Sequence, residues 1–226
     1  MPKPFDFTVK TKQDLIEAVQ TFGFVPLFRN SIAGFSVEEH AAPAAWFAAQ
    51  EGVWEWKGPV IRETGCAYGK FFEKKAAFIS AEWFCDFANF RRDGYDFDAR
   101  WEEGLAARAD KRLYDLVEAD GPILSKRLKA LGDYRRGGRT GFDTSLNRLQ
   151  AQCYIVTSDF VYLRDKYGRP YGWGVAEYAL PEQTMGERFL ENVYCREPEE
   201  SYRRVFGHLR ALLPQASEAQ IGRFLR

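Results

Sequence analysis

The stretch that decides the fold is residues 110–153, DKRLYDLVEADGPILSKRLKALGDYRRGGRTGFDTSLNRLQAQC. Apolar residues recur in it at helical spacing in three runs, and each run predicts one helix. Asp120-Gly121-Pro122 ends the first helix, Ser125 caps the second, which ends at Gly132, and Asp143 or Thr144 caps the third. The side chains expected to face inward from the three helices are Leu113, Leu116 and Val117, then Leu128 and Leu131, then Phe142, Leu146, Leu149 and Cys153.

Two β-rich runs follow the third helix. They are Tyr154–Arg164 and Tyr171–Leu180, joined by the turn-forming segment Asp165-Lys-Tyr-Gly-Arg-Pro170. Three helices followed by a hairpin are the order of elements in a winged helix-turn-helix. We therefore expect an α+β fold, mainly helical, whose winged helix occupies residues 106–182.

The remaining chain divides into the regions on either side of this unit. Residues 1–105 predict an aromatic-rich α+β region, and residues 183–226 predict an exposed acidic segment followed by C-terminal helices. The predicted helices there begin at Thr11, at Ser36 or Pro43, and at Ser80, and further helices cover Phe97–Ala119, Tyr202–Leu213 and Ser217–Leu225. The predicted strands or hairpins are Val53–Ile61 and Ala67–Ile79.

Composition excludes several classes of protein. Hydrophobic residues make up 46% of the chain and aromatic residues 16%, which is enough for a packed core. The four cysteines are scattered and there are two histidines, so we expect reduced thiols, no disulfide framework and no metal site. No phosphate-loop or dinucleotide motif indicates a cofactor, and no apolar run indicates a membrane span or a signal peptide, so we expect a cytoplasmic protein.

Charge is distributed unevenly along a chain that has 32 basic and 32 acidic residues. Residues 121–150 hold seven cationic and two acidic side chains, a net charge of +5, whereas residues 181–200 have a net charge of −4. A cationic cluster on the second and third helices predicts phosphate contacts with double-stranded DNA. The expected DNA-binding residues are Lys126, Arg127, Lys129, Arg135, Arg136, Arg139, Asn147 and Arg148, with Lys166 and Arg169 at the tip of the hairpin. A solvated loop and a protein-interaction surface are the alternatives.

Several short motifs resemble the AlkZ-related family, whose relatives include bacterial winged-helix DNA glycosylases. These motifs are Trp54-Glu-Trp56-Lys57, Tyr68-Gly-Lys-Phe-Phe72, Lys75-Ala-Ala-Phe-Ile-Ser80, Arg91-Arg-Asp-Gly-Tyr95 and Tyr178-Ala-Leu-Pro181. The resemblance to the family covers nearly the whole chain, and that to the glycosylases covers about residues 53–182 loosely. It implies a winged helix and a link to DNA repair.

Catalysis is the point at which the sequence departs from those enzymes. The glycosylases carry a Gln-x-Gln or Gln-x-Asp motif near the N-terminus, whereas here Gln150-Ala-Gln152 ends the third predicted helix. We therefore expect a DNA-binding protein without an intact glycosylase motif. The alternatives are a glycosylase that excises alkylated or cross-linked bases through a relocated site and a protein-interaction module. Lys70 or Lys74 beside Trp56 and Tyr68 is the candidate pocket, in which an amine lies among stacking rings.

Overall fold

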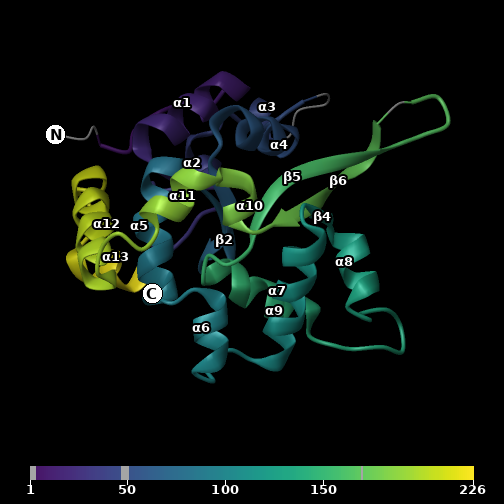
Figure 1. The fold of residues 1–226 in the computed structure, drawn as a ribbon. Helices are drawn as coiled ribbons and strands as arrows, with labels where there is room; N and C mark the ends of the chain where they lie inside the picture. The colour runs from purple at the N-terminus through teal and green to yellow at the C-terminus, as the bar shows by residue number, and fades with distance from the viewer. Residues whose placement is uncertain (1–3, 47–50, 169) are drawn as a thin grey trace.

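The computed structural model describes residues 4–46, 51–168 and 170–226, and these residues form a mixed α+β fold with two three-stranded antiparallel sheets (Figure 1). The first sheet has the order β1-β3-β2, and Ile79 pairs with Phe24 on one side and with Ala67 on the other. Its strands are Phe24–Pro26 (β1), Ala67–Phe72 (β2) and Lys75–Ile79 (β3). The hairpin predicted for Ala67–Ile79 is confirmed.

The first half of the chain surrounds this sheet with five helices in the described residues. They are Lys12–Phe22 (α1), Val37–His40 (α2), Pro43–Trp46 (α3), Val53–Thr64 (α4) and Ala81–Arg92 (α5). The Thr11 hydroxyl accepts from the Asp14 amide and the Asp14 carboxylate from the Thr11 amide, so the predicted start of α1 is confirmed. Of the two predicted starts Ser36 and Pro43, both are used: Ser36 caps α2, and Pro43 begins α3.

Helix α4 corrects the strand predicted for Val53–Ile61. The two tryptophans alternate like strand residues, but the buried positions recur at helical spacing: Val53, Trp56, Lys57, Val60 and Ile61. Gly58 supports this packing, because a Cβ there would lie 2.6 Å from the carboxylate of Asp159 on the neighbouring strand. The Gly58-Pro59 pair, which looks like a turn in the sequence, therefore lies inside a helix.

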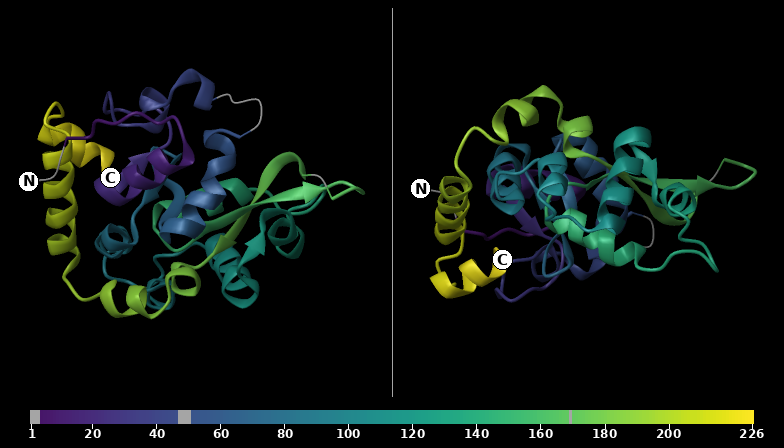
Figure 2. Two further views of the ribbon diagram at one scale, coloured as in Figure 1. Left: turned by 90° about the horizontal axis from the view of Figure 1, so that it is seen from above. Right: turned by 60° about the horizontal axis from the view of Figure 1, so that its bottom comes forward.

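The second half of the chain has the order α7, β4, α8, α9, β5, β6. These elements are Arg108–Asp120 (α7), Ile123–Leu124 (β4), Ser125–Leu131 (α8), Phe142–Ala151 (α9), Val156–Arg164 (β5) and Pro170–Ala179 (β6), and Phe97–Glu102 (α6) precedes them. The sheet order is β4-β6-β5, and the β5–β6 hairpin projects beyond the body in every view (Figures 1 and 2). Helix α9 packs against β2, which joins the two halves.

Three details of this half differ from prediction. The long helix expected for Phe97–Ala119 is two helices, because Gly104 between them adopts a φ of +72°. The N-caps are Leu124 for α8 and Gly141 for α9, one or more residues before the predicted caps Ser125 and Asp143 or Thr144. Leu131 was expected to face inward, but its side chain is 48% exposed at the end of the short α8.

The buried side chains form two hydrophobic clusters. One contains the aromatic residues of the first half together with the C-terminal helices Pro198–Leu212 (α12) and Glu218–Phe224 (α13), and the other contains α7, α8 and α9. The acidic segment was expected to be exposed throughout, but it forms Pro181–Met185 (α10) and Glu187–Asn192 (α11), which bury Phe189. Its glutamates except the half-buried Glu182 are exposed as expected.

Candidate nucleic-acid interface

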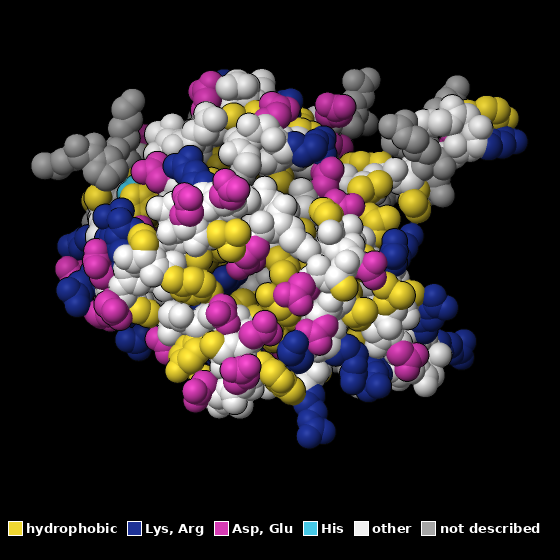
Figure 3. Space-filling view, in the orientation of Figure 1, with side chains coloured by type: hydrophobic (Ala, Val, Ile, Leu, Met, Phe, Trp, Pro, Cys, Tyr) yellow, Lys and Arg dark blue, Asp and Glu magenta, His cyan; other side chains and the backbone are white. Residues whose placement is uncertain are grey.

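The cationic cluster lies on α8, the α8–α9 loop and α9. Six of its seven basic side chains are exposed and Lys129 is half-buried. In Figure 3 the Lys and Arg side chains gather at the lower right, where Figure 1 shows α8 and the loop that follows it. The structure therefore gathers side chains of like charge on one part of the surface.

Ion pairs engage three of these seven cations. Arg127 pairs with Asp120 at 3.2 Å and Lys129 with Asp143 at 3.7 Å, both at the surface. Lys126, Arg135, Arg136 and Arg139 have no ion pair and no side-chain hydrogen bond with any residue that the structure describes. These four cations, named here the free cations, can meet an external anion without breaking an internal bond.

The backbone of the α8–α9 loop folds back on itself and turns its arginines outward. The amide of Arg139 donates to the carbonyl of Asp133 at 2.7 Å, and the amide of Gly138 donates to that of Arg135 at 2.8 Å. A Cβ on Gly138 would lie 2.3 Å from the Asp133 carbonyl oxygen, so this close turn requires glycine. The three exposed arginines consequently sit on a hydrogen-bonded turn.

Arg148 has an internal partner, unlike the free cations. Its Nε and Nη2 donate to the two carboxylate oxygens of Asp110 on α7, at 2.6 and 2.9 Å, and Asp110 is buried. These hydrogen bonds raise the pKa of Arg148 and link α7 to α9. A role for Arg148 in reading a base stays a prediction, and so does that of the half-buried Asn147 beside it.

The Gln150-Ala-Gln152 motif lies at the end of α9. Gln150 is 2% exposed, its Oε1 accepts from the Lys70 amide at 3.4 Å, and its Nε2 donates to the Thr157 hydroxyl at 3.3 Å. Gln150 thus bridges β2 and β5, while Gln152 is the half-buried C-cap residue. Its two internal bonds give Gln150 a structural role in this fold.

The four residues of the candidate pocket occupy different surroundings. Trp56 on α4 lines a cavity between α4 and the hairpin, whereas Lys70 and Lys74 are exposed on β2 and its turn. Tyr68 is buried against Phe78, and burial raises the pKa of its hydroxyl. Of the four predicted residues, Trp56 alone is among the described residues that line this cavity.

Among the hairpin side chains that the structure describes, the basic Lys166 and the aromatic Tyr167 and Trp173 are exposed. Lys166 lies at the tip with its ammonium 4.9 Å from the ring centre of Tyr167, and Arg169 lies outside the described residues. Trp173 is 76% exposed and was missed by the sequence reasoning, although its setting Gly172-Trp-Gly174 is a recognisable signal for a bulge.

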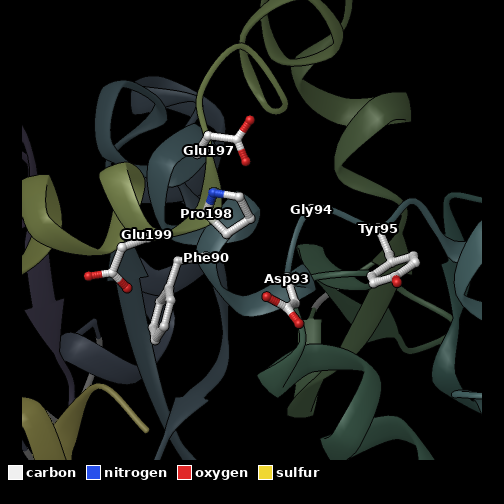
Figure 4. A pocket seen from close by; sticks show the side chains of 7 residues that line it. All are labelled: Phe90, Asp93, Gly94, Tyr95, Glu197, Pro198 and Glu199. Carbon is white, nitrogen blue, oxygen red and sulfur yellow. The ribbon is translucent and has the colours of Figure 1, made fainter.

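A second cavity, of about 690 Å³, lies between the end of α5 and the start of α12 (Figure 4). Its lining includes the carboxylates of Asp93, Glu197 and Glu199, which point in different directions in Figure 4. Because carboxylates repel phosphate, this cavity does not suit a nucleic-acid backbone.

Sequence reasoning also missed Arg92, which lies at the contact between the two halves. Its guanidinium is 1% exposed and donates to Glu182 at 2.7 Å, to the Tyr194 hydroxyl at 2.9 Å and to the Cys153 carbonyl at 2.8 Å. Burial alone would lower the pKa of Arg92, but the charge of Glu182 raises it above its ordinary value. The acidic segment therefore has its own internal partner in Arg92.

The other ion pairs of the acidic segment also lie away from the free cations. Glu199 pairs with Arg203 at 3.3 Å and Glu200 with Arg196 at 3.4 Å. Among the described residues, no group of three metal-ligating side chains converges, and none of the helices is long and apolar enough to cross a membrane.

Comparison with known proteins gives one match. A family model described as AlkZ related matches residues 9–226, which is nearly the whole chain. No curated protein and no solved structure matches the chain.

Proposed function

The chain belongs to the AlkZ-related family, and from this premise we propose that it binds double-stranded DNA through a winged helix made of α7, α8, α9 and the β4-β6-β5 sheet. The order of these elements supports the proposal, because a winged helix places its recognition helix before a hairpin wing. The family also suggests a relationship to DNA-repair glycosylases.

The observation that carries this proposal is the group of four free cations, Lys126, Arg135, Arg136 and Arg139. DNA binding is driven largely by release of counterions when cationic side chains neutralise phosphates. Side chains that are exposed and unpaired lose no internal bond when they do this. Arg148 would have to leave the buried Asp110 carboxylate, so we assign it to holding α9 on α7.

Binding without glycosylase chemistry is the form of the function that we favour. Both amide atoms of Gln150 are engaged within the fold, and the remaining glutamine, Gln152, lies at the end of α9 and not in an N-terminal unit. Family membership keeps base excision as the second candidate function. Duplexes with alkylated or cross-linked bases, assayed for abasic sites against a protein-free control, distinguish the two.

Salt dependence of binding to a short duplex tests the proposal. Four phosphate contacts predict a slope of about −3.5 in a plot of log K against log salt concentration. Replacing Arg135, Arg136 and Arg139 by alanine should reduce the magnitude of that slope by about 2.7.

The matched control replaces three exposed arginines of α12 and α13, Arg203, Arg210 and Arg223, by alanine. It makes the same change in net charge and should leave the slope close to that of the wild type. Equal slopes for the wild type and the Arg135, Arg136, Arg139 variant, or equal losses in the two triple variants, would contradict the proposal. Failure of the wild type to bind DNA would favour a protein-interaction module.

A further inference from the structure

A cavity of about 670 Å³ lies between α4 and the β5–β6 hairpin, and none of the four free cations is among the described residues that line it. Three aromatic side chains line it, Trp56 from α4 and Phe160 and Tyr162 from β5. Glu51 and Glu55 line the same cavity from the segment that begins α4. It therefore combines ring faces with carboxylates.

Charge in this cavity is unbalanced. The Lys12–Glu63 and Arg62–Asp159 ion pairs at its border neutralise themselves. Glu51 and Glu55 have no ion pair with any described residue, although the Glu55 carboxylate accepts from the Gly52 amide at 3.0 Å. Glu51, Glu55 and Tyr162 line the same cavity, and burial, followed by the charges of Glu55 and Glu51, raises the pKa of Tyr162.

Phe160, one of these three rings, already contacts a cation of the protein itself, together with Trp54 from outside the cavity lining. The Lys57 ammonium lies 4.5 Å from the ring centre of Trp54 and 4.3 Å from that of Phe160. Aromatic faces attract cations electrostatically, and the attraction is larger where water is excluded. Lys57 offsets part of the charge of Glu55. The lining still holds three carboxylates, Glu51, Glu55 and Glu63, against the two cations Lys12 and Arg62, so the cavity keeps an excess of negative charge.

The bulge in β6 leaves room for the Tyr162 ring at the cavity. Val161 pairs with Val175 and Leu163 with Tyr171, so Gly172, Trp173 and Gly174 face Tyr162 alone. A Cβ on Gly174 would lie 3.1 Å from the Tyr162 ring, and Gly172, which lines the cavity, has a φ of +71°. Glycine at both positions lets the strand bend without closing the space.

From this geometry we propose that the cavity binds a small organic cation of the alkylammonium class, with its charge facing Glu51 and Glu55 and its methyl groups against Trp56, Phe160 and Tyr162. The site shares β5 and β6 with the proposed winged helix, but none of the four free cations is among the described residues that line it. Its carboxylates would repel phosphate.

The test compares choline with 3,3-dimethyl-1-butanol, in which carbon replaces the charged nitrogen. Binding to the full chain is followed by the indole N–H resonance of Trp56 in proton–nitrogen NMR spectra, assigned with a Trp56→Phe variant. We expect choline to shift this resonance at millimolar concentration and the neutral alcohol to bind at least about fivefold more weakly. Equal shifts by the two compounds, or no shift by choline, would overturn the proposal.

A double variant, Glu51→Gln with Glu55→Gln, should weaken choline binding about tenfold, because two nearby charges are removed. Glutamine at position 55 retains an oxygen that can accept from the Gly52 amide and so keeps the helix cap. Glu51→Gln alone changes an exposed side chain and provides the same test at smaller magnitude if the double variant does not fold. Glu191→Gln on α11 is the matched control, and equal affinity of the double variant and this control would contradict the assignment.

Discussion

The Arg92–Glu182 pair makes a quantitative prediction about how the two halves are held together. Arg92 on α5 is buried, and its bonds reach α10, Tyr194 after α11, and Cys153 before β5. Changing Glu182 to Gln keeps the shape and a neutral acceptor but leaves the guanidinium buried without a compensating charge. Removing one partner of a buried ion pair costs about 3–5 kcal/mol, and because the Glu182 side chain is 25% exposed we expect about 2 kcal/mol.

Arg92→Met separates the charge effect from packing. Methionine fills much of the same volume, but the Cys153 carbonyl loses its donor and Glu182 loses its cation, so we expect a cost of about 3–4 kcal/mol. With Arg92 absent, the Glu182→Gln change should cost less than about 0.5 kcal/mol, which gives a coupling energy of about 2 kcal/mol in a double-mutant cycle.

Urea unfolding, followed by far-ultraviolet circular dichroism and tryptophan fluorescence, measures these free energies of unfolding. For a chain of this length, about 2 kcal/mol corresponds to a decrease in Tm of roughly 4–8 °C. The exposed Glu191→Gln variant is the control and should unfold like the wild type. If Glu182→Gln costs the same with and without Arg92, the two side chains are not coupled and Arg92 does not hold the halves through its charge.

Two further predictions concern buried titratable groups. Burial lowers the pKa of Lys57 to about 8, so between pH 8 and 10 the unfolded chain binds more protons at this position than the folded chain. The free energy of unfolding should therefore rise by about 1–2 kcal/mol over this pH range, relative to that of a Lys57→Met variant. Parallel pH profiles of the two proteins would contradict this. Burial raises the pKa of Cys66 and Cys153 to about 12 and also raises that of Cys85, whereas Cys195 is exposed. An aromatic disulfide reagent should therefore react rapidly with one thiol of the folded protein, and with all four thiols only in denaturant. Rapid reaction of the folded Cys195→Ala variant would refute this.

Elements with strong local signals were predictable from the sequence. The Thr11 cap, the hairpin after Ala67 and the three helices before the β5–β6 hairpin follow from side-chain patterns that act within one element. Helix α4 was not predictable in the same way, because Gly58 accommodates the close approach of the Asp159 carboxylate, and the local sequence contains no sign of that packing. That contact joins residues about a hundred positions apart.

The candidate interface shows the same division between local and distant information. Clustering of cations in residues 121–150 could be read from the sequence, and so could their position on the second and third helices of the unit. The sequence could not show which of these cations lack an internal partner. Asp110 lies 38 positions before Arg148 and contacts it only after α7 packs on α9. The burial of Gln150 likewise depends on the packing of α9 on β2.

Zero net charge does not argue against salt-dependent DNA binding by this chain. At physiological ionic strength charges are screened over about 8 Å, so a phosphate responds to the side chains near it and not to the total. Asp120 and Asp143, which border the cluster, each pair with a different cation, and the acidic segment pairs with Arg92, Arg196 and Arg203. Asp133 lies in the α8–α9 loop without an ion pair to any described residue, and the four free cations outnumber it. The internal pairing of acids elsewhere contributes to leaving Lys126, Arg135, Arg136 and Arg139 as a local excess of positive charge. Because that excess exists before DNA arrives, the proposed DNA binding would require no internal ion pair of these four side chains to break.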